Sequence, residues 1–329
     1  MAHAELPSFA DRIRATLDHR KLHLTVTPTE KCNFRCVYCY EDFSVGRMKR
    51  PVVEGLKRLI SIRAPELLEL QISWFGGEPL LQKDIVLEVS EHARTACDGS
   101  SALFISDMTT NGYLLDVGLA RDLAAQGVRR FQISLDGDRE THGQTRKLAD
   151  GGNSFDRIWG NLLALQGSDL DLEVTIRVHY QAGGKGELPG FVDRLMSIFG
   201  EDQRFRLFVR PISPLGGPRD AEVRRVSTED NAQILGALQQ RAKSDEDKIA
   251  TWALGRTSMC YAAAPNHFLI RADGRIGKCT VAMAKDVNAV GMLRSDGSMQ
   301  LDQAKLGKWS RGLKSGVASE LACPLHGIA

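Results

Sequence analysis

The feature that most constrains the fold of this chain is a strand pattern that recurs six times. The six stretches are short and rich in residues that favour β-structure, and they lie at about 22–27, 68–75, 103–108, 130–135, 173–178 and 205–210. Segments with helical periodicity separate them, at 52–62, 84–96, 117–125, 155–165 and 191–198. This alternation predicts an α/β fold in which right-handed crossovers connect the strands of a parallel sheet.

Several of these strands alternate between apolar and polar residues. In the fourth strand Phe131, Ile133 and Leu135 alternate with Gln132, Ser134 and Asp136, and the fifth and sixth strands repeat the pattern. Parallel strands covered on both faces usually read as continuous apolar runs. If the apolar residues face the helices, the polar residues face the inside of the sheet, where they need contact with water or a ligand. The pattern therefore favours a curved, partly open sheet around a polar cavity, and an exposed sheet face is the alternative.

The last third of the chain follows a different pattern. The segment 213–219, SPLGGPR, predicts a loop, and a helix is expected at 228–242. Farther on, Asp273–Gly274 predicts a hairpin turn, and a second turn is expected at 295–298. We expect an N-terminal extension, a core, a linker with a helix, and a small α+β subdomain, at 1–20, 21–212, 213–259 and 260–329. A subdomain of about 70 residues buries little core, so a metal would help to stabilise it.

Composition excludes several classes of protein. The 329 residues carry 43 Lys and Arg against 41 Asp and Glu, a formal net charge of +2, with no run of like charge. This balance argues against a nucleic-acid partner. No stretch approaches the roughly 20 apolar residues of a membrane span, and residues 1–14 contain no apolar signal core. The sequence predicts a cytoplasmic protein without a membrane partner.

The seven cysteines carry the strongest chemical signal. Their odd number in a long chain argues against a disulfide framework. Cys32, Cys36 and Cys39 are spaced C-x3-C-x2-C in a loop after the first strand, and three such thiolates can hold three irons of a cubane cluster and leave the fourth iron exposed. Zinc is the alternative, although no fourth ligand follows at a matching spacing. Cys97 has no partner pattern and is expected to be a buried small residue.

The C-x3-C-x2-C spacing, with Tyr38 before the third cysteine, resembles the signature of the radical S-adenosylmethionine (radical SAM) enzymes. Three later stretches resemble further motifs of that family in the same order along the chain: FGGEPLL, TTNGYLL and ISLDG. The resemblance implies a partial (β/α)6 barrel. It also implies a [4Fe–4S] cluster on the three cysteines and S-adenosylmethionine (SAM) bound at its open iron.

The same resemblance implies roles for individual residues. It places Gly76, Gly77, Glu78 and Pro79 near the methionine amino group of SAM, where glycine lets the backbone approach a ligand closely. Asp136 is expected to be catalytic together with the three cysteines. The other expected SAM-binding residues are Tyr38, Thr110, Asn111, Ser134, Arg146 and Arg177. For Arg177, an ion pair with Glu173 or another inner acid is the alternative.

The last three cysteines resemble part of a second cluster site. Cys260, Gly274 and Cys279 form C-x13-G-x4-C, which is similar to the first half of the SPASM or shorter twitch extension of radical SAM enzymes. A full SPASM extension would supply seven cysteines, but only Cys323 remains here. The resemblance therefore implies one auxiliary iron–sulfur cluster, with Cys260, Cys279 and Cys323 as its ligands. Zinc or a vestigial site is the alternative. The candidates for a fourth ligand are His267, Glu320, His326, water and a substrate thiolate.

The resemblance is to the peptide-modifying branch, which includes the maturases of ribosomally made peptides and the anaerobic sulfatase maturases. It implies cleavage of SAM to a 5′-deoxyadenosyl radical and removal of hydrogen from a peptide or protein side chain, to give a crosslinked, thioether or oxidised residue. The implied partners are a precursor peptide or protein and an electron donor such as flavodoxin or ferredoxin. Because only about 20 residues precede the first strand, where a leader-recognition domain usually needs about 80, either a separate protein presents the peptide or the cavity recognises it unaided.

Two other functions stay open. One is a radical SAM enzyme that acts on a small molecule, similar to the molybdenum-cofactor cyclase, which also has a barrel, a cysteine triplet and three C-terminal cysteines. The spacing of those last cysteines differs, and the cyclase ends in two glycines whereas this sequence ends in Gly327-Ile328-Ala329. The other is a non-catalytic module that binds zinc or an iron–sulfur cluster.

Overall fold

The computed structural model describes residues 9–182, 187–241, 249–251 and 259–328. Its parallel strands are β1 (Lys21–Val26), β2 (Glu69–Trp74), β3 (Leu103–Thr110), β4 (Val128–Leu135), β5 (Glu173–Tyr180), β6 (Phe205–Pro211), β7 (Ile249–Thr251) and β8 (His267–Ile270). Three antiparallel strands follow: β9 (Arg275–Gly277), β10 (Gly291–Leu293) and β11 (Met299–Leu301).

Helices follow most of the strands. The longer ones are α1 (Phe9–Leu17), α2 (Arg50–Arg63), α3 (Lys83–Asp98), α4 (Val117–Ala125), α6 (Phe155–Gln166), α7 (Glu187–Phe199) and α8 (Thr228–Arg241). The shorter ones are α5 (Arg139–Thr145), α9 (Gln303–Trp309), α10 (Arg311–Ser315) and α11 (Ala318–Ala322). Single 3₁₀ turns include η2 (Pro79–Gln82), η3 (Asp220–Glu222) and η5 (Tyr261–Ala263).

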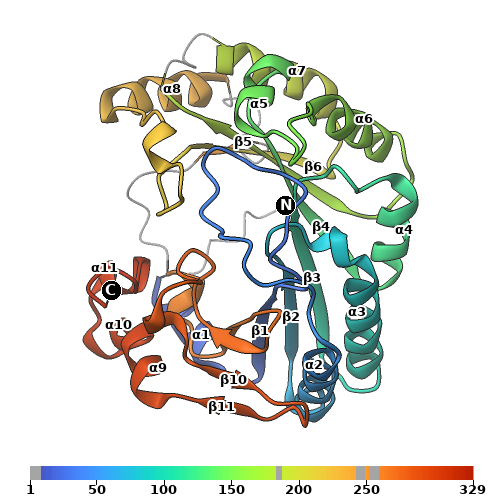
Figure 1. The fold of residues 1–329 in the computed structure, drawn as a ribbon, viewed down its shortest axis with the longest axis vertical. Coiled ribbons are helices and arrows are strands. Elements are labelled where there is room, and N and C mark those ends of the chain that lie inside the picture. The colour runs from blue at the N-terminus through green and yellow to red at the C-terminus, as the bar shows by residue number, and fades with distance from the viewer. Residues whose placement is uncertain (1–8, 183–186, 242–248, 252–258, 329) are drawn as a thin grey trace.

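All eleven strands belong to one sheet, in the order β11-β10-β9-β8-β1-β2-β3-β4-β5-β6-β7. The sheet curves, and α2, α3, α4, α6 and α7 cover its outer side, as Figure 1 shows. The prediction of a curved, open parallel sheet is confirmed. Each end of the six predicted strands lies within two residues of its observed position.

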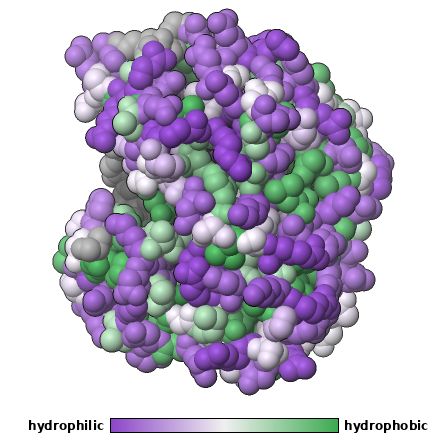
Figure 2. Space-filling view, viewed as in Figure 1, coloured by the Kyte–Doolittle hydropathy of each residue, from purple (hydrophilic) through white to green (hydrophobic). Residues whose placement is uncertain are grey.

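The core lies between the sheet and the outer helices. The apolar members of the alternating strands, such as Ile133 and Leu135, are buried there, while Trp74 donates its indole N–H to Ser90 Oγ at 3.2 Å. Hydrophilic residues cover most of the face seen in Figure 2. No helix among the described residues is long and apolar enough to cross a membrane.

The region after residue 260 continues the main sheet. β8 pairs in parallel with β1, so that His23 lies opposite His267, and β9 turns back on β8. Both predicted turns are confirmed, with Gly274 and Gly297 in left-handed backbone conformations at φ of 88°. The domain boundary at 260 stays a prediction, since the sheet itself runs through both parts.

Candidate active site

The cysteine triplet lies in the long loop between β1 and α2, drawn in blue in Figure 1. Backbone hydrogen bonds fasten this loop to the segment after α5: Arg35 N donates to Lys147 O and Val37 N to Thr145 O, both at 2.9 Å. A bridge between Phe34 and Leu148 continues the contact. The loop has no regular structure of its own, and its shape therefore depends on this neighbouring segment.

The glycine motif after β2 packs against the residues just before Cys32. Glu78 N donates to Lys31 O at 3.0 Å. A Cβ atom on Gly77 would lie 2.4 Å from Lys31 O, and Gly76 has φ of +115°, which side chains rarely adopt. In this structure the glycines therefore allow a close approach between two backbone segments. Their expected contact with SAM stays a prediction.

Glu78 is the centre of a buried hydrogen-bond cluster that joins β2 to β3. Its carboxylate accepts from Thr110 Oγ1 and Asn111 N at 2.8 Å and from Leu80 N at 3.0 Å. Burial raises the pKa of Glu78 more than these bonds lower it. Asn111 Nδ2 in turn donates to Asn33 Oδ1 at 2.8 Å, which carries the cluster into the cysteine loop. The structure thus brings together three of the predicted site residues.

A second buried network surrounds Asp136 at the end of β4. Its Oδ1 lies 3.1 Å from His179 Nδ1, and its Oδ2 accepts from Thr145 Oγ1 at 2.9 Å. The Tyr38 hydroxyl lies 3.3 Å from the same His179 nitrogen and accepts from Arg146 Nη1 at 2.6 Å. Four elements far apart in the sequence therefore meet at one connected polar group, directly beside Cys36.

The charges in this network follow from burial and partnership. Burial lowers the pKa of His179 to about 4, even though Asp136 raises it. Burial alone would raise the pKa of Asp136, but its hydrogen bond with His179 and the charge of Arg146 hold it well below the ordinary value. At neutral pH the pair is a neutral imidazole that donates to an ionised carboxylate.

Two arginines face this region with unused hydrogen-bonding capacity. Arg146 Nε and Arg177 Nε are buried and have no hydrogen-bond partner among the described residues. Ser134 lies opposite Arg177 in the register of β4 and β5. Glu173, the alternative partner for Arg177, instead lies 3.6 Å from Arg130. Buried, unpartnered guanidinium nitrogens are suited to bind an anionic group.

The three thiols of the triplet are partly buried. Burial is the main cause of a raised pKa at each of them, and for Cys39 it brings the pKa to about 12. Phe34 N donates to Cys32 Sγ at 3.3 Å. In the part of the chain that the structure describes, no three His, Cys, Asp or Glu side chains converge closely enough to hold one metal ion. The thiols share a loop without meeting at a single point.

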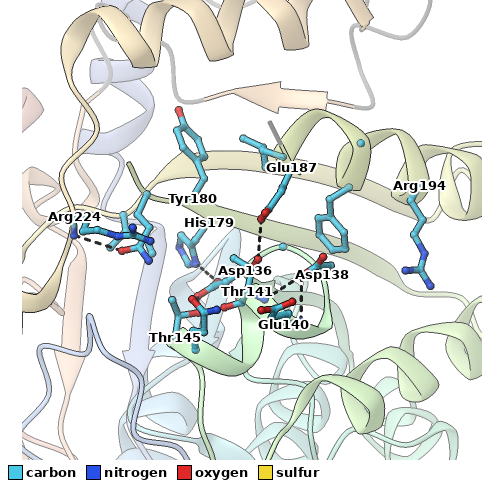
Figure 3. A pocket seen from close by; sticks show the side chains of 17 residues that line it. Asp136, Asp138, Glu140, Thr141, Thr145, His179, Tyr180, Glu187, Arg194 and Arg224 are labelled. Carbon is cyan, nitrogen blue, oxygen red and sulfur yellow. Dashed lines mark hydrogen bonds and ion pairs between the residues drawn. The ribbon is translucent and has the colours of Figure 1, made fainter. Parts of the chain in front are cut away.

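A cavity of about 510 Å³ opens next to Asp136 and His179. It lies between α5 and α7 at the carboxyl ends of β4 and β5, where the loops of parallel sheets bind ligands. Figure 3 shows His179 pointing at Asp136 on its floor, with Arg194 and Arg224 at opposite sides. Both positive and negative side chains therefore line the cavity.

The last three cysteines lie near one another, although not closely enough to hold one metal ion. Cys260 N donates to Leu321 O at 2.8 Å, which holds the start of η5 beside the segment that contains Cys323. The thiols of Cys279 and Cys323 both affect the pKa of Cys260, which burial raises to about 11. Cys97, in contrast, is buried in the core on α3, as predicted.

Of the candidates for a fourth ligand, Glu320 is engaged elsewhere, and His267 is engaged through one of its two ring nitrogens. The Glu320 carboxylate accepts from Arg311 Nε at 3.1 Å and from Ser315 Oγ at 2.5 Å. His267 Nε2 lies 2.9 Å from Thr25 Oγ1, and its Nδ1 is buried without a partner among the described residues. The fourth ligand stays unassigned.

Direct contacts connect the two groups of cysteines. The hydroxyl of Tyr40, next to Cys39, lies close enough to Thr280, next to Cys279, for Thr280 to lower the pKa of Tyr40, which burial raises overall. Nearby, Arg271 of the β8–β9 hairpin forms a two-pronged ion pair with Glu30, at 2.7 and 2.8 Å. The C-terminal region is therefore fastened to both ends of the triplet loop.

Comparison with known proteins assigns the core. Residues 26–182 match the protein-family model described as "Radical SAM superfamily". This part of the chain is therefore similar to the radical SAM superfamily. The matched range contains the triplet, the glycine motif and both buried networks. Cys260, Cys279 and Cys323 lie outside it, and their auxiliary cluster stays a prediction.

Curated relatives of the radical SAM domain include GTP 3′,8-cyclases. The chain is 37% identical over 117 residues to that of Peptoclostridium acidaminophilum, a match that covers 35% of this chain and 34% of the relative. It is 32% identical over 172 residues to that of Caulobacter vibrioides, covering 52% and 47%. The chain thus spans less than half the length of these relatives.

Solved structures share the fold of most of the chain. A structure of anSMEcpe with AdoMet and a peptide bound has a TM-score of 0.68 at 17% identity, covering 88% of this chain and 82% of that one. SuiB of Streptococcus suis, bound to its precursor peptide SuiA, has a TM-score of 0.62 at 16% identity, covering 96% and 75%. At these identities the likeness confirms the predicted fold and says nothing further about the substrate.

Some residues of the site were not predicted as site residues. Thr145 binds Asp136, and Arg219 contacts the triplet loop. His179, which also binds Asp136, does carry a sequence signal, because it lies near the carboxyl end of the alternating strand β5, at the sheet edge where ligands bind. For Arg219 no local signal exists, since its partners lie more than 180 residues away in the sequence.

Proposed function

We propose that this chain cleaves SAM reductively and uses the resulting radical to remove a hydrogen atom from a substrate. The observation that carries the proposal is the convergence of the Glu78 cluster and the Asp136 network on a single loop with three thiols. A [4Fe–4S] cluster, when bound, would supply the electron that splits SAM into methionine and a 5′-deoxyadenosyl radical. The donor set fits such a cluster, because three thiols in one loop leave one iron open.

We assign the following roles to the chain's own residues. Arg146 and Arg177 would bind the carboxylate of SAM with the guanidinium nitrogens that have no partner in the structure. Asp136, held ionised by His179, would accept hydrogen bonds from the ribose hydroxyls. Glu78 holds Asn111 and the glycine motif in place, which would orient the methionine amino group.

The substrate that we propose is a small polar molecule. The relatives that are more than 30% identical over the radical SAM domain are GTP 3′,8-cyclases, whereas the peptide-binding enzymes share only the fold. The comparisons thus favour the small-molecule alternative over the peptide substrate that the sequence motifs implied. The charged cavity of about 510 Å³ has a volume suited to a ligand of that class.

A peptide substrate is the second candidate. The specific observation in its favour is that the fold matches the peptide enzymes over 88% and 96% of this chain. For either substrate, we propose one auxiliary cluster on Cys260, Cys279 and Cys323, and an electron donor such as flavodoxin or ferredoxin.

The SAM-cleaving activity is tested by reconstituting the protein anaerobically with iron and sulfide. Dithionite and SAM should then yield 5′-deoxyadenosine, detected by liquid chromatography and mass spectrometry. Cys36→Ala should abolish the product, because the triplet loses a ligand. Cys97→Ala is the matched control and should keep it. Equal yields from the Cys36 variant and the wild type would refute the role of the triplet.

The substrate class is tested in the same reaction with GTP. A small-molecule substrate of this kind should accelerate 5′-deoxyadenosine formation and be consumed in proportion. A parallel reaction contains, in place of GTP as the only candidate substrate, both GTP and a precursor peptide encoded beside the gene. A mass change in that peptide, with GTP left intact, would replace the first substrate by the second without affecting the assignment of SAM cleavage.

A further inference from the structure

We propose that Arg219 is a positioning residue for the cysteine triplet, and that the segment 213–219 forms a strap over the outer side of the triplet loop. This inference rests on the proposed cluster at Cys32, Cys36 and Cys39, and it concerns a part of the chain outside the matched radical SAM domain. The strap follows directly after β6. In the sheet, β2, β3, β4 and β5 separate β6 from β1, the strand that precedes the triplet loop.

The strap contacts the triplet loop at two separate points. Arg219 Nη2 donates to the carbonyl oxygens of Arg35 and Cys36, at 2.6 and 2.8 Å. At Gly217 the backbones themselves touch: a Cβ atom there would lie 2.3 Å from Cys39 O. The sequence between the first and last cysteine of the triplet is therefore held from outside along most of its length.

The strap has a defined shape of its own. Gly216 adopts φ of +94°, and its N–H donates to Asp220 Oδ2 at 2.6 Å. Asp220 N donates back to Gly217 O at 3.2 Å. This closed turn fixes the backbone on both sides of Arg219, so the guanidinium is presented at little cost in side-chain and backbone entropy.

Arg219 completes a pattern that Arg35 begins. Arg35 Nη1 donates to Cys32 O at 2.8 Å and to Phe34 O at 2.6 Å. With the two bonds from Arg219, guanidinium groups therefore hold four carbonyl oxygens of the loop between its first two cysteines.

The peptide N–H groups next to two of these carbonyls are fixed as well, because Arg35 N donates to Lys147 O and Val37 N to Thr145 O, both at 2.9 Å. In a trans peptide the N–H points opposite to the carbonyl, and the described chain contains no cis peptide. One of the two peptides whose oxygens Arg219 holds ends at the Cys36 N–H, so this N–H points away from Arg219. N–H groups and positive charge near the sulfurs set the potential and stability of iron–sulfur sites.

The first test uses the full chain without metal, so it does not depend on cluster chemistry. The variants are Arg219→Gln and Gly217→Ala, and the matched control is Arg225→Gln, an exposed arginine of the same region. Alkylation of Cys36 is followed by peptide mapping, with buried Cys97 as the internal reference. Both strap variants should alkylate at Cys36 about tenfold faster, which corresponds to about 1.4 kcal/mol of lost restraint. A rate equal to that of the control in both variants would overturn the proposal.

The second test uses the reconstituted protein. Arg219→Gln should bleach faster in air, and its midpoint potential should move to more negative values, because the reduced cluster carries more negative charge and loses a nearby cation. Arg219→Lys keeps the charge but cannot span two carbonyls, so the potential should be partly restored while bleaching stays fast. If the wild type binds no iron at the triplet, the proposed function and this inference both fail. If it does and Arg219→Gln matches Arg225→Gln, only this inference fails.

Discussion

His179 shows how one buried side chain can organise a site that four elements build. Its Nδ1 atom lies between Asp136 and the Tyr38 hydroxyl, and Tyr38 is bound by Arg146. A phenylalanine at this position would leave the Asp136 carboxylate with one hydrogen-bond donor fewer in a buried setting. Such a loss costs about 1.5–3 kcal/mol.

We therefore expect His179→Phe to lower the rate of 5′-deoxyadenosine formation by about tenfold to hundredfold. His179→Gln keeps a neutral donor and should recover most of that loss. The measurement is the initial rate as a function of SAM concentration, which separates binding of SAM from its cleavage. Equal rates for the phenylalanine variant and the wild type would show that the network is structural only.

The pKa of His179 makes a further prediction about pH. Because burial lowers this pKa to about 4, the imidazole stays neutral as the pH rises or falls through the ordinary histidine value of 6.5. The rate ratio between wild type and His179→Gln should therefore be constant between about pH 6 and 8. A ratio that changes with a midpoint near 6.5 would contradict the buried, neutral state.

Cys279 separates the two proposed metal sites. It lies outside the matched radical SAM domain and is buried near Cys260. Cys279→Ala should leave part of the SAM cleavage intact, because the triplet keeps its ligands, while product from the substrate is lost. Iron counting and 5′-deoxyadenosine yield measure the two effects. A complete loss of cleavage, with the triplet iron still bound, would contradict independent sites.

At the scale of elements, the strands and outer helices were predictable because their periodicity is local. The helix α5 was missed because its sequence, RETHGQT, is short and polar and has no apolar face to detect. The edge strand β7 has only three residues. The pairing of β8 with β1 joins residues more than 240 positions apart, and no local pattern encodes such a partner.

The hairpin of β8 and β9 is fastened to the triplet loop by a buried ion pair. Arg271→Met should destabilise the protein by about 3–5 kcal/mol, because it leaves the Glu30 carboxylate buried without its partner. The double variant, Arg271→Met with Glu30→Gln, should lose less free energy of unfolding than the two single variants lose together. Urea unfolding measures these differences.

The matched control for that cycle is Arg275→Met. Arg275 pairs with Asp273 in the same hairpin at 2.7 Å, but it is substantially exposed, and such pairs contribute about 1 kcal/mol or less. If Arg271→Met and Arg275→Met lowered the free energy of unfolding equally, burial of the Glu30–Arg271 pair would add nothing to its contribution to stability.

At the scale of the whole molecule, buried histidines make stability sensitive to weak acid. Burial lowers the pKa of His23 to about 4 and that of His142 to about 3. Below pH 6.5 the unfolded chain binds protons that the folded chain does not, so stability falls as the pH drops from 6.5 toward 4. Each such group contributes about 1.4 kcal/mol per pH unit in that window.

His23→Gln should therefore flatten this acid dependence, since glutamine does not titrate and can still bond to Ser73. The free energy of unfolding of the metal-free full chain, measured in urea at about pH 7.5 and 5, gives the slope. His19→Gln changes an exposed histidine and should leave the slope as it is. An unchanged slope in the His23 variant would mean that other groups dominate.

The candidate site was predictable in part. The triplet, Glu78, Thr110, Asn111 and Arg146 lie in sequence motifs, and the structure brings them together. The contacts from Arg219, Arg271 and Thr280 were not predictable, because each depends on how distant segments pack rather than on neighbouring residues.

The position of β8 in the sheet has a consequence for the order in which the chain folds during synthesis. β1 leaves the ribosome first, but one of its two edges stays unpaired until residues 267–270 have been made. An open strand edge invites pairing with other chains, and pairings distant in sequence form slowly. During the same interval the Glu30 carboxylate also lacks its ion-pair partner, Arg271. A nascent chain stalled before residue 267 should therefore aggregate readily, and only nearly complete synthesis closes the sheet beside the cysteine loop.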